Sequence, residues 1–223
     1  MRTAILSICV VSLLTVSYAQ ADTISYSNTY GPTSVSFSGL LVPLTKFDPA
    51  LGTLTKVTLQ LNANTNAGSI AWDNEGGVAS SVTLQIGATV KASAPLNLIA
   101  VTAVPVQSGS GSVSADNDAS PDYIGDDAFG VTGGTGSDSN SAFTTSSLST
   151  FIATFAGETF NATLESSIKT TLSTDGGYGP INPSPGLTDG TVKVTYEYTP
   201  IPEPVTMSLL GLGGLGMLLK RRR

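Results

Sequence analysis

The stretch VKVTYEY at residues 192–198 decides the fold class, because apolar and polar side chains alternate along it. A period of two places one set of side chains in a core and the other in water, as in a half-buried β-strand. The same alternation recurs at residues 57–62 and 82–86. We therefore expect strands at all three places, paired in antiparallel sheets that keep one face solvated.

Further strands are indicated by shorter runs of β-branched and apolar residues between clusters of Gly, Pro, Asn and Asp. These runs are residues 23–30, 34–39, 69–72, 96–104 and 158–169, and a brief helical turn is expected at residues 147–151. Many short strands favour two packed sheets over a helical arrangement. The sequence thus predicts an all-β fold, an antiparallel β-sandwich of jelly-roll or Ig-like type.

Residues 107–141 have a different character, since they are rich in Gly, Ser and Asp and show no sustained period. Long segments without periodicity usually run over the surface as loops. We therefore predict a long surface loop here, within a single domain that extends over residues 22–200.

The N-terminus has the three parts of a secretory signal. Arg2 supplies a basic start, residues 4–16 form an apolar run, and Ala19 and Ala21 form a small-x-small cleavage site. We expect residues 1–21 to be a signal peptide that signal peptidase removes after Ala21.

The C-terminus combines a helix breaker, an apolar segment and a basic cluster. Residues 205–219 carry no charge, and they are flanked by Pro202-Glu203-Pro204 and by Lys220, Arg221, Arg222 and Arg223. A helix over these residues spans roughly 22 Å, which is short for a bilayer unless the basic side chains snorkel. The basic cluster favours a cytoplasmic end. We expect a short transmembrane helix with the domain outside the inner membrane.

This combination resembles the PEP-CTERM sorting signal of Gram-negative bacteria, with Pro202, Glu203 and Pro204 as its tripeptide. The resemblance implies that the tail at residues 201–223 anchors the chain transiently in the inner membrane. It also implies that an exosortase cuts near the tripeptide, so that the domain reaches the cell surface or the exterior. The alternative is an ordinary C-terminal anchor, which also leaves the domain outside.

The charge balance of residues 22–200 excludes one class of partner. Five lysines stand against 15 acidic residues in this range, which gives a formal net charge of −10. Nucleic-acid binding depends mainly on cationic contacts to phosphate. We therefore expect no nucleic-acid partner.

The lack of histidine and of cysteine in residues 22–200 further restricts the kinds of catalytic and metal site that the domain can form. Histidine is absent, and the single cysteine is Cys9 in the predicted signal peptide. This excludes Ser-His-Asp and Cys-His nucleophilic sites and the usual zinc and copper ligands. We expect no catalytic residues, no enzymatic activity and no required cofactor.

An acidic run within the predicted loop suggests calcium. Its candidate ligands are Asp116, Asp118, Asp122 and Asp127. Oxygen ligands at alternate positions suit this hard cation, but Pro121 occupies the sixth position, where the known calcium loop requires glycine. A solvated acidic loop is therefore the alternative.

A second group of residues suggests carbohydrate chemistry. Trp72 could contact a sugar, with Tyr123 or Tyr178 as further stacking platforms. Asp73 and Glu75 lie beside it, and a retaining glycosidase needs two carboxyl groups about 5 Å apart. The alternative is a packed aromatic side chain followed by an ordinary turn.

Several segments of the domain resemble the choice-of-anchor E family. They are residues 47–54, 57–59, 148–155 with Gly157, and 192–200. The resemblance implies export and anchoring, with no activity or cofactor. We predict a structural or adhesive surface or extracellular-matrix protein associated with exopolysaccharide or biofilm. A carbohydrate-binding module is the first alternative and a carboxylate-only glycoside hydrolase the second.

Overall fold

The computed structural model describes residues 20–66, 68–118 and 121–201. Asp22–Ile201 form one compact unit, and it is described here by itself. Residues 1–19 of the predicted signal peptide, including Ala19, lie outside the described residues, as do the sorting tripeptide and the basic cluster, whereas Ala21 is described and exposed. Within these ranges, no helix is long and apolar enough to cross a membrane.

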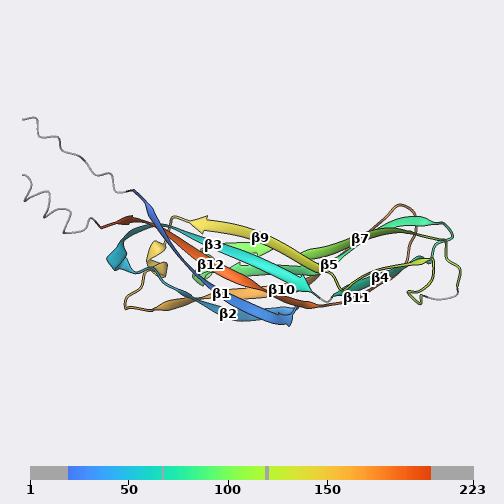
Figure 1. The fold of residues 1–223 in the computed structure, drawn as a ribbon, viewed down its shortest axis with the longest axis horizontal. Coiled ribbons are helices and arrows are strands. Elements are labelled where there is room, and N and C mark those ends of the chain that lie inside the picture. The colour runs from blue at the N-terminus through green and yellow to red at the C-terminus, as the bar shows by residue number, and fades with distance from the viewer. Residues whose placement is uncertain (1–19, 67, 119–120, 202–223) are drawn as a thin grey trace, which may run out of the picture. The chain divides into compact units, whose positions relative to one another are not determined.

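The described chain is built of strands, with three short 3-10 turns and no α-helix (Figure 1). The strands are β1 (Asp22–Ser34), β2 (Phe37–Thr45), β3 (Gly52–Asn66), β4 (Ser69–Asp73), β5 (Ser80–Ser93), β6 (Ala100–Ala103), β7 (Val106–Val113), β8 (Ala128–Thr132), β9 (Thr135–Thr144), β10 (Thr159–Thr174), β11 (Ile181–Ser184) and β12 (Leu187–Pro200). The 3-10 turns are η1 (Pro49–Leu51), η2 (Pro95–Asn97) and η3 (Leu148–Phe151). The predicted all-β fold and the turn near residue 150 are confirmed.

The strands form three sheets. The first has the order β1-β12-β3-β9, the second β2-β10-β5-β6 with β7 also paired to β5, and the third β11-β4-β8. All pairings between these strands are antiparallel. The antiparallel prediction is confirmed, whereas the choice between jelly-roll and Ig-like topology stays a prediction.

The first two sheets enclose a common core, which is the arrangement of a β-sandwich. The alternation at residues 192–198 places its apolar side chains inside, as predicted. Val192, Val194 and Tyr196 are fully buried in this core. Alternate residues of β3 and β5 join them from the two sheets. Burying a large apolar side chain contributes about 1.5–3 kcal/mol, so this periodic pattern stabilises the pairing register.

Side chains close the open edges between the two sheets. Asp138 on β9 accepts a hydrogen bond from the Val104 backbone N–H at 2.6 Å, and Asn140 donates to the Thr102 carbonyl at 3.0 Å. Between β1 and β2, Asn28 donates to the Pro43 carbonyl at 3.2 Å. Each of these three backbone groups is thereby unavailable for pairing with another chain.

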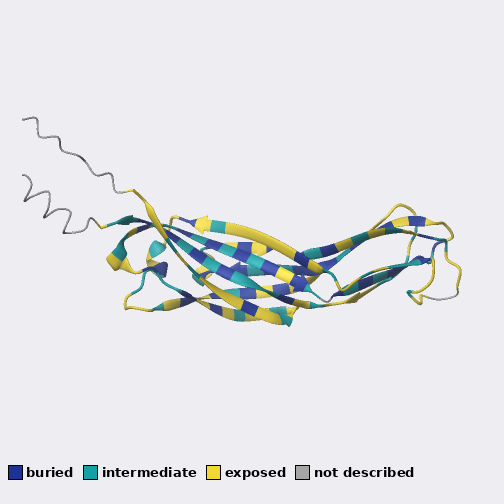
Figure 2. Cartoon of the chain, viewed as in Figure 1, coloured by how far each residue is buried: buried dark blue, intermediate teal, exposed yellow. Residues whose placement is uncertain are grey.

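Strand β5 continues beyond this core into a second one (Figure 2). Its residues Ala88, Val90 and Ala92 belong to the first core, whereas Val82, Leu84 and Ile86 belong to the second. Strand β4 supplies Ile70 and Trp72 to the second core from the third sheet. The second core therefore lies between the third sheet and the extended part of the second sheet.

The predicted loop at residues 107–141 was wrong, because β7, β8 and most of β9 lie in this range. The glycines of β7 have a packing role. A Cβ on Gly111 would lie 2.5 Å from the Phe129 ring of β8, and one on Gly109 would lie 2.6 Å from Val131. Glycine in a strand often marks such a close approach. Only residues 114–127 connect β7 to β8 without a strand, and we call them the acidic loop.

Candidate functional site

The acidic loop is fixed to the end of β4 by Asp73. One carboxylate oxygen of this residue, Oδ2, accepts hydrogen bonds from the backbone N–H groups of Asp122 at 2.8 Å and Tyr123 at 2.7 Å. Asp73 is only 1% exposed. Tyr123 has a positive φ of 61°, an unfavourable conformation for a non-glycine residue. The buried carboxylate therefore holds the loop in a conformation that its sequence alone does not favour.

Asn74 fixes the start of the same loop. Its fully buried side chain donates to the Val78 carbonyl at 2.9 Å and to the Ser114 carbonyl at 2.7 Å. Its Oδ1 accepts from the Gly76 N–H at 3.1 Å. Charged and amide side chains with all their hydrogen bonds made are well suited to rigid turns. Asp73 and Asn74 thus form a rigid base for the loop.

Asp127 lies at the C-terminal end of the acidic loop and is 1% exposed. Its Oδ2 accepts from the Asn117 backbone N–H at 3.2 Å. Its Oδ1 is buried and has no hydrogen-bond partner in the described part of the chain. A buried polar oxygen without a partner is costly, and no other carboxylate oxygen of the described residues is in this situation.

The predicted calcium residues lie on one loop, but two of them accept hydrogen bonds from backbone N–H groups of the same loop. Asp122 Oδ1 accepts from the Ile124 N–H at 2.8 Å, and Asp116 Oδ1 accepts from the Asp118 N–H at 3.1 Å. Among the described residues, no three acidic side chains are arranged as a metal-binding group. The regular spacing in the sequence therefore does not produce the predicted ligand set.

The pKa of Glu75 reflects the negative charge of the neighbouring carboxylates. Partial desolvation raises the pKa of Glu75 above its ordinary value, and the neighbouring carboxylates raise it further. These carboxylates are Asp116, Asp73, Asp118 and Asp127, in order of decreasing effect. Repulsion of this kind indicates a strongly negative local potential.

Trp72 does not offer the sugar contact that the sequence suggested. Its ring is fully buried in the second core, and its Nε1–H donates to the Gly179 carbonyl at 3.3 Å. Gly177 also packs against the ring, since a Cβ there would lie 2.8 Å from it. The aromatic face needed for sugar stacking is therefore covered. Tyr178 is 69% exposed, whereas Tyr123 is half-buried.

A surface depression lies elsewhere, near the start of β1 and the end of β2. We call it the base groove; it has a volume of about 310 Å³ and is lined by Tyr26, Thr45, Lys46, Asp48, Pro49, Ala153, Thr154, Phe155, Ala156 and Gly157. The Phe155 side chain is 67% exposed. A groove with aromatic and polar side chains together has the mixed character of many ligand sites. Sequence analysis missed this site because its two halves lie about a hundred residues apart in the chain.

An ion pair supports one wall of the base groove. The Lys46 ammonium contacts Glu158 Oε1, and Glu158 Oε2 accepts from the Thr154 N–H at 2.6 Å and from its hydroxyl at 2.9 Å. The hydrogen bond from Lys46, followed by those from Thr154, lowers the pKa of Glu158 to about 2. The carboxylate therefore stays ionised throughout the ordinary pH range.

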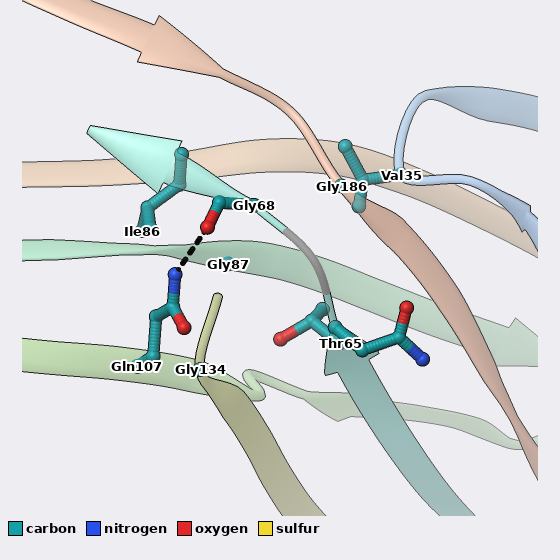
Figure 3. A pocket seen from close by; sticks show the side chains of 9 residues that line it. Val35, Thr65, Gly68, Ile86, Gly87, Gln107, Gly134 and Gly186 are labelled. Carbon is teal, nitrogen blue, oxygen red and sulfur yellow. Dashed lines mark hydrogen bonds between the residues drawn. The ribbon is translucent and has the colours of Figure 1, made fainter. Parts of the chain in front are cut away.

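A second cavity lies where the two cores meet (Figure 3). Gln107 borders it and donates from Nε2 to the Gly68 carbonyl at 2.7 Å. The cavity measures about 10 Å³, which is close to the space of a single water molecule. It is too small to hold a sugar or a cofactor.

Comparison with known proteins identifies the tail. Residues 200–223 match the PEP-CTERM protein-sorting motif. The resemblance predicted for the C-terminus is therefore confirmed, whereas these comparisons give no support to the choice-of-anchor E resemblance. No curated protein matches the chain.

Solved structures add no functional argument. The structure of infectious bursal disease virus Gt strain is 12% identical, with 93% of this chain and 51% of that chain covered, at a TM-score of 0.10. The VP2 subviral particle of that virus is 12% identical, with 92% of this chain and 49% of that chain covered, at a TM-score of 0.10. The structure of the Gx strain is 16% identical, with 84% of this chain and 42% of that chain covered, at a TM-score of 0.11. This chain thus spans about half the length of those chains or less. The sorting motif remains the informative match, and it indicates an exported protein that an exosortase sorts through its C-terminus.

Proposed function

We propose that this protein is a non-enzymatic structural or adhesive component of the cell surface or extracellular matrix, associated with exopolysaccharide or biofilm. The observation that carries the proposal is the sorting motif at residues 200–223, which begins where the folded unit Asp22–Ile201 ends. An exosortase system delivers such a unit to the exterior. A stable acidic β-domain is suited to a passive role there.

The titratable groups near the acidic loop support a role without catalysis. Asp73 uses Oδ2 for two backbone hydrogen bonds, so the carboxylate that the hydrolase alternative requires is already engaged. A catalytic carboxylate needs access to a substrate proton or carbon. A buried group that holds a loop lacks that access.

Processing can be tested with the full-length chain in an exosortase-containing host. We expect mass spectrometry of the extracellular form to show a new C-terminus near Pro202. Replacing Pro202, Glu203 and Pro204 with alanine should keep the protein in the membrane fraction. An intact Arg223 on released wild-type protein would contradict processing.

The matrix role needs a separate test. Deletion of the gene should reduce biofilm mass or the protein content of purified exopolysaccharide, and re-expression of the wild-type chain should restore it. Re-expression of the alanine-substituted tail variant is the matched control, because it supplies the same folded unit without sorting. Equal biofilm with and without the protein would reject this role.

The base groove favours carbohydrate binding as a second candidate function. Tyr26 and the exposed Phe155 offer aromatic surface, and Lys46 and Asp48 offer polar groups beside it. Aromatic surface bordered by hydrogen-bonding groups is the usual composition of a sugar site.

This candidate can be tested on the released form with a glycan array followed by calorimetry. We expect Phe155→Ala to weaken binding at least tenfold. Phe143→Ala is the matched control, since Phe143 is similarly exposed at 64% but does not line the groove. Equal loss in both variants, or no binding by the wild type, would exclude the groove as a sugar site.

A further inference from the structure

We infer that, while the sorting tail is attached, the end of the sandwich from which the tail leaves rests on the lipid surface of the membrane, with Phe155 as its main contact. We call this part the base end; it comprises η1, residues 153–157 and Ile201. The contact concerns the form that still carries its tail, so it is independent of the matrix role of the released form.

The segments of the base end lie together although they are distant in the sequence. The Ile201 N–H donates to the Leu51 carbonyl at 3.3 Å, and Pro49 and Phe155 line the same base groove. Strand β1 also begins at this end, beside the last residues of β12 (Figure 1). The predicted signal peptide and the sorting tail therefore leave the folded unit at the same end.

The spacer between the base end and the apolar part of the tail is short. Strand β12 stays paired with β3 as far as Pro200, and only the three residues of the sorting tripeptide separate Ile201 from the uncharged segment at residues 205–219. The backbone extends by no more than about 3.6 Å per residue, so it can span roughly 14 Å at most between Ile201 and that segment. Membrane anchoring through the C-terminus therefore keeps the base end close to the headgroup layer.

Exposed apolar side chains gather at the base end. Phe155 is 67% exposed and Ile201 is 58% exposed, and Pro49, Ala50 and Ala156 are exposed in the same segments. Contact of a large apolar side chain with water is unfavourable. Phenylalanine is also among the side chains that interfacial segments bury at the boundary between headgroups and acyl chains. A lipid surface is thus suited to cover Phe155.

The turn that carries Phe155 is held in shape by hydrogen bonds. The Phe155 carbonyl accepts from the Glu158 N–H at 3.3 Å, and Glu158 Oε2 accepts from the Thr154 N–H at 2.6 Å. Gly157 completes the turn with a φ of 78°. Preorganisation of this kind reduces the entropy that a contact must overcome. The aromatic side chain is therefore presented to the lipid without further ordering of the chain.

Charge alone would not bring the domain to a membrane. Residues 22–200 carry a formal net charge of −10, and Lys46 at the base groove is paired with Glu158. An anionic lipid surface therefore repels the free domain. The attached tail makes the contact intramolecular and raises the effective concentration of the lipid surface. Cleavage of the tail should consequently free Phe155 together with the domain.

A fluorescent label can test this contact, because Cys9 is the single cysteine of the chain. In a Cys9→Ser background, Ala156→Cys places an environment-sensitive nitrobenzoxadiazole label beside Phe155. Ala79→Cys is the matched control, since it places the label at another exposed alanine, in the turn before the part of β5 that belongs to the second core.

The full chain is reconstituted in phosphatidylcholine vesicles that contain spin-labelled lipid. We expect the emission of the label at position 156 to be blue-shifted, and its quenching by the spin-labelled lipid to be at least threefold stronger than at position 79. The released form, mixed with the same vesicles, should show neither effect.

A second substitution assigns the contact to Phe155. Phe155→Ser should reduce the lipid quenching of the label at position 156 at least twofold. Phe143→Ser should leave it unchanged, because Phe143 is similarly exposed at 64% but lies on β9, outside the base end. The comparison of positions 156 and 79 in the otherwise unchanged chain remains valid if Phe155→Ser does not fold.

Equal quenching at positions 156 and 79 would overturn the lipid contact, as would an unchanged signal in Phe155→Ser. Quenching that persists in the released form would show that the tail is not what brings the base end to the lipid, and it would also contradict the inference. A signal at position 156 that appears only when exosortase is present in the vesicles would assign the base end to the enzyme instead of the lipid.

Discussion

The two hydrogen bonds that Asp73 accepts from the Asp122 and Tyr123 backbone determine how the acidic loop is held. Asp73→Ala would leave both N–H groups without this partner in a part-buried setting. Loss of such bonds costs about 1–3 kcal/mol for each unsatisfied group. We expect the free energy of unfolding to fall by about 2–4 kcal/mol. Urea denaturation measures it, and Glu165→Ala on the exposed face of β10 should change it by less than about 0.5 kcal/mol.

Glu158 makes stability depend on pH at the base groove. Its pKa is lowered from 4.5 to about 2 in the folded state. The contact with Lys46 and Thr154 therefore stabilises the fold fully above about pH 4.5 and loses this contribution as the pH falls toward 2. We expect the melting temperature of the wild type to fall more steeply from pH 5 to pH 2.5 than that of Glu158→Gln. Parallel curves for the two proteins would show that this carboxylate does not set the acid response.

At the scale of the elements, β7 and β8 pack closely because Gly111 of β7 leaves room for the Phe129 ring of β8. A methyl group on Gly111 would lie 2.5 Å from the Phe129 ring, so Gly111→Ala forces the two strands apart. We expect a loss of about 1–3 kcal/mol in the free energy of unfolding. Phe129→Leu should recover part of this loss in the double variant, which a double-mutant cycle by thermal denaturation can measure. Gly77→Ala is the control, because nothing lies within 4 Å of a Cβ there.

The same pair explains why the sequence predicts a loop where the structure has strands. The sequence QSGSGSV at residues 107–113 has small residues at almost every position, and glycine normally indicates a turn. Gly109 and Gly111 remain in a strand because β8 supplies Val131 and Phe129 to cover them. Those side chains lie about twenty residues further along the chain, outside any local pattern.

At the scale of the whole molecule, the folded unit ends directly at the sorting motif. Strand β12 pairs with β3 as far as Pro200 opposite Gly52, and the Ile201 N–H donates to the Leu51 carbonyl at 3.3 Å. Pro202 follows immediately in sequence. An enzyme that cuts near the tripeptide must therefore work next to a paired strand end.

Insertion of Gly-Ser-Gly-Ser between Ile201 and Pro202 should speed removal of the tail, because the enzyme would no longer compete with this pairing. We expect the cleaved fraction in a pulse-chase experiment to rise at least twofold at early times. The same four residues inserted after Gly77, in an open turn, are the matched control. Identical rates for all three proteins would show that the strand end does not limit processing.

The sequence by itself determined the strands that alternate with period two and the sorting tail. Both depend on neighbouring residues: the pleat of a strand fixes which side of it Val192, Val194 and Tyr196 occupy, and the tail is a contiguous motif. Only the tertiary structure decided that Trp72 is covered and that Asp127 keeps one oxygen unpaired. Burial and hydrogen-bond satisfaction depend on groups such as Gly177 and Gly179, which reach Trp72 from about a hundred residues away once the sheets have packed.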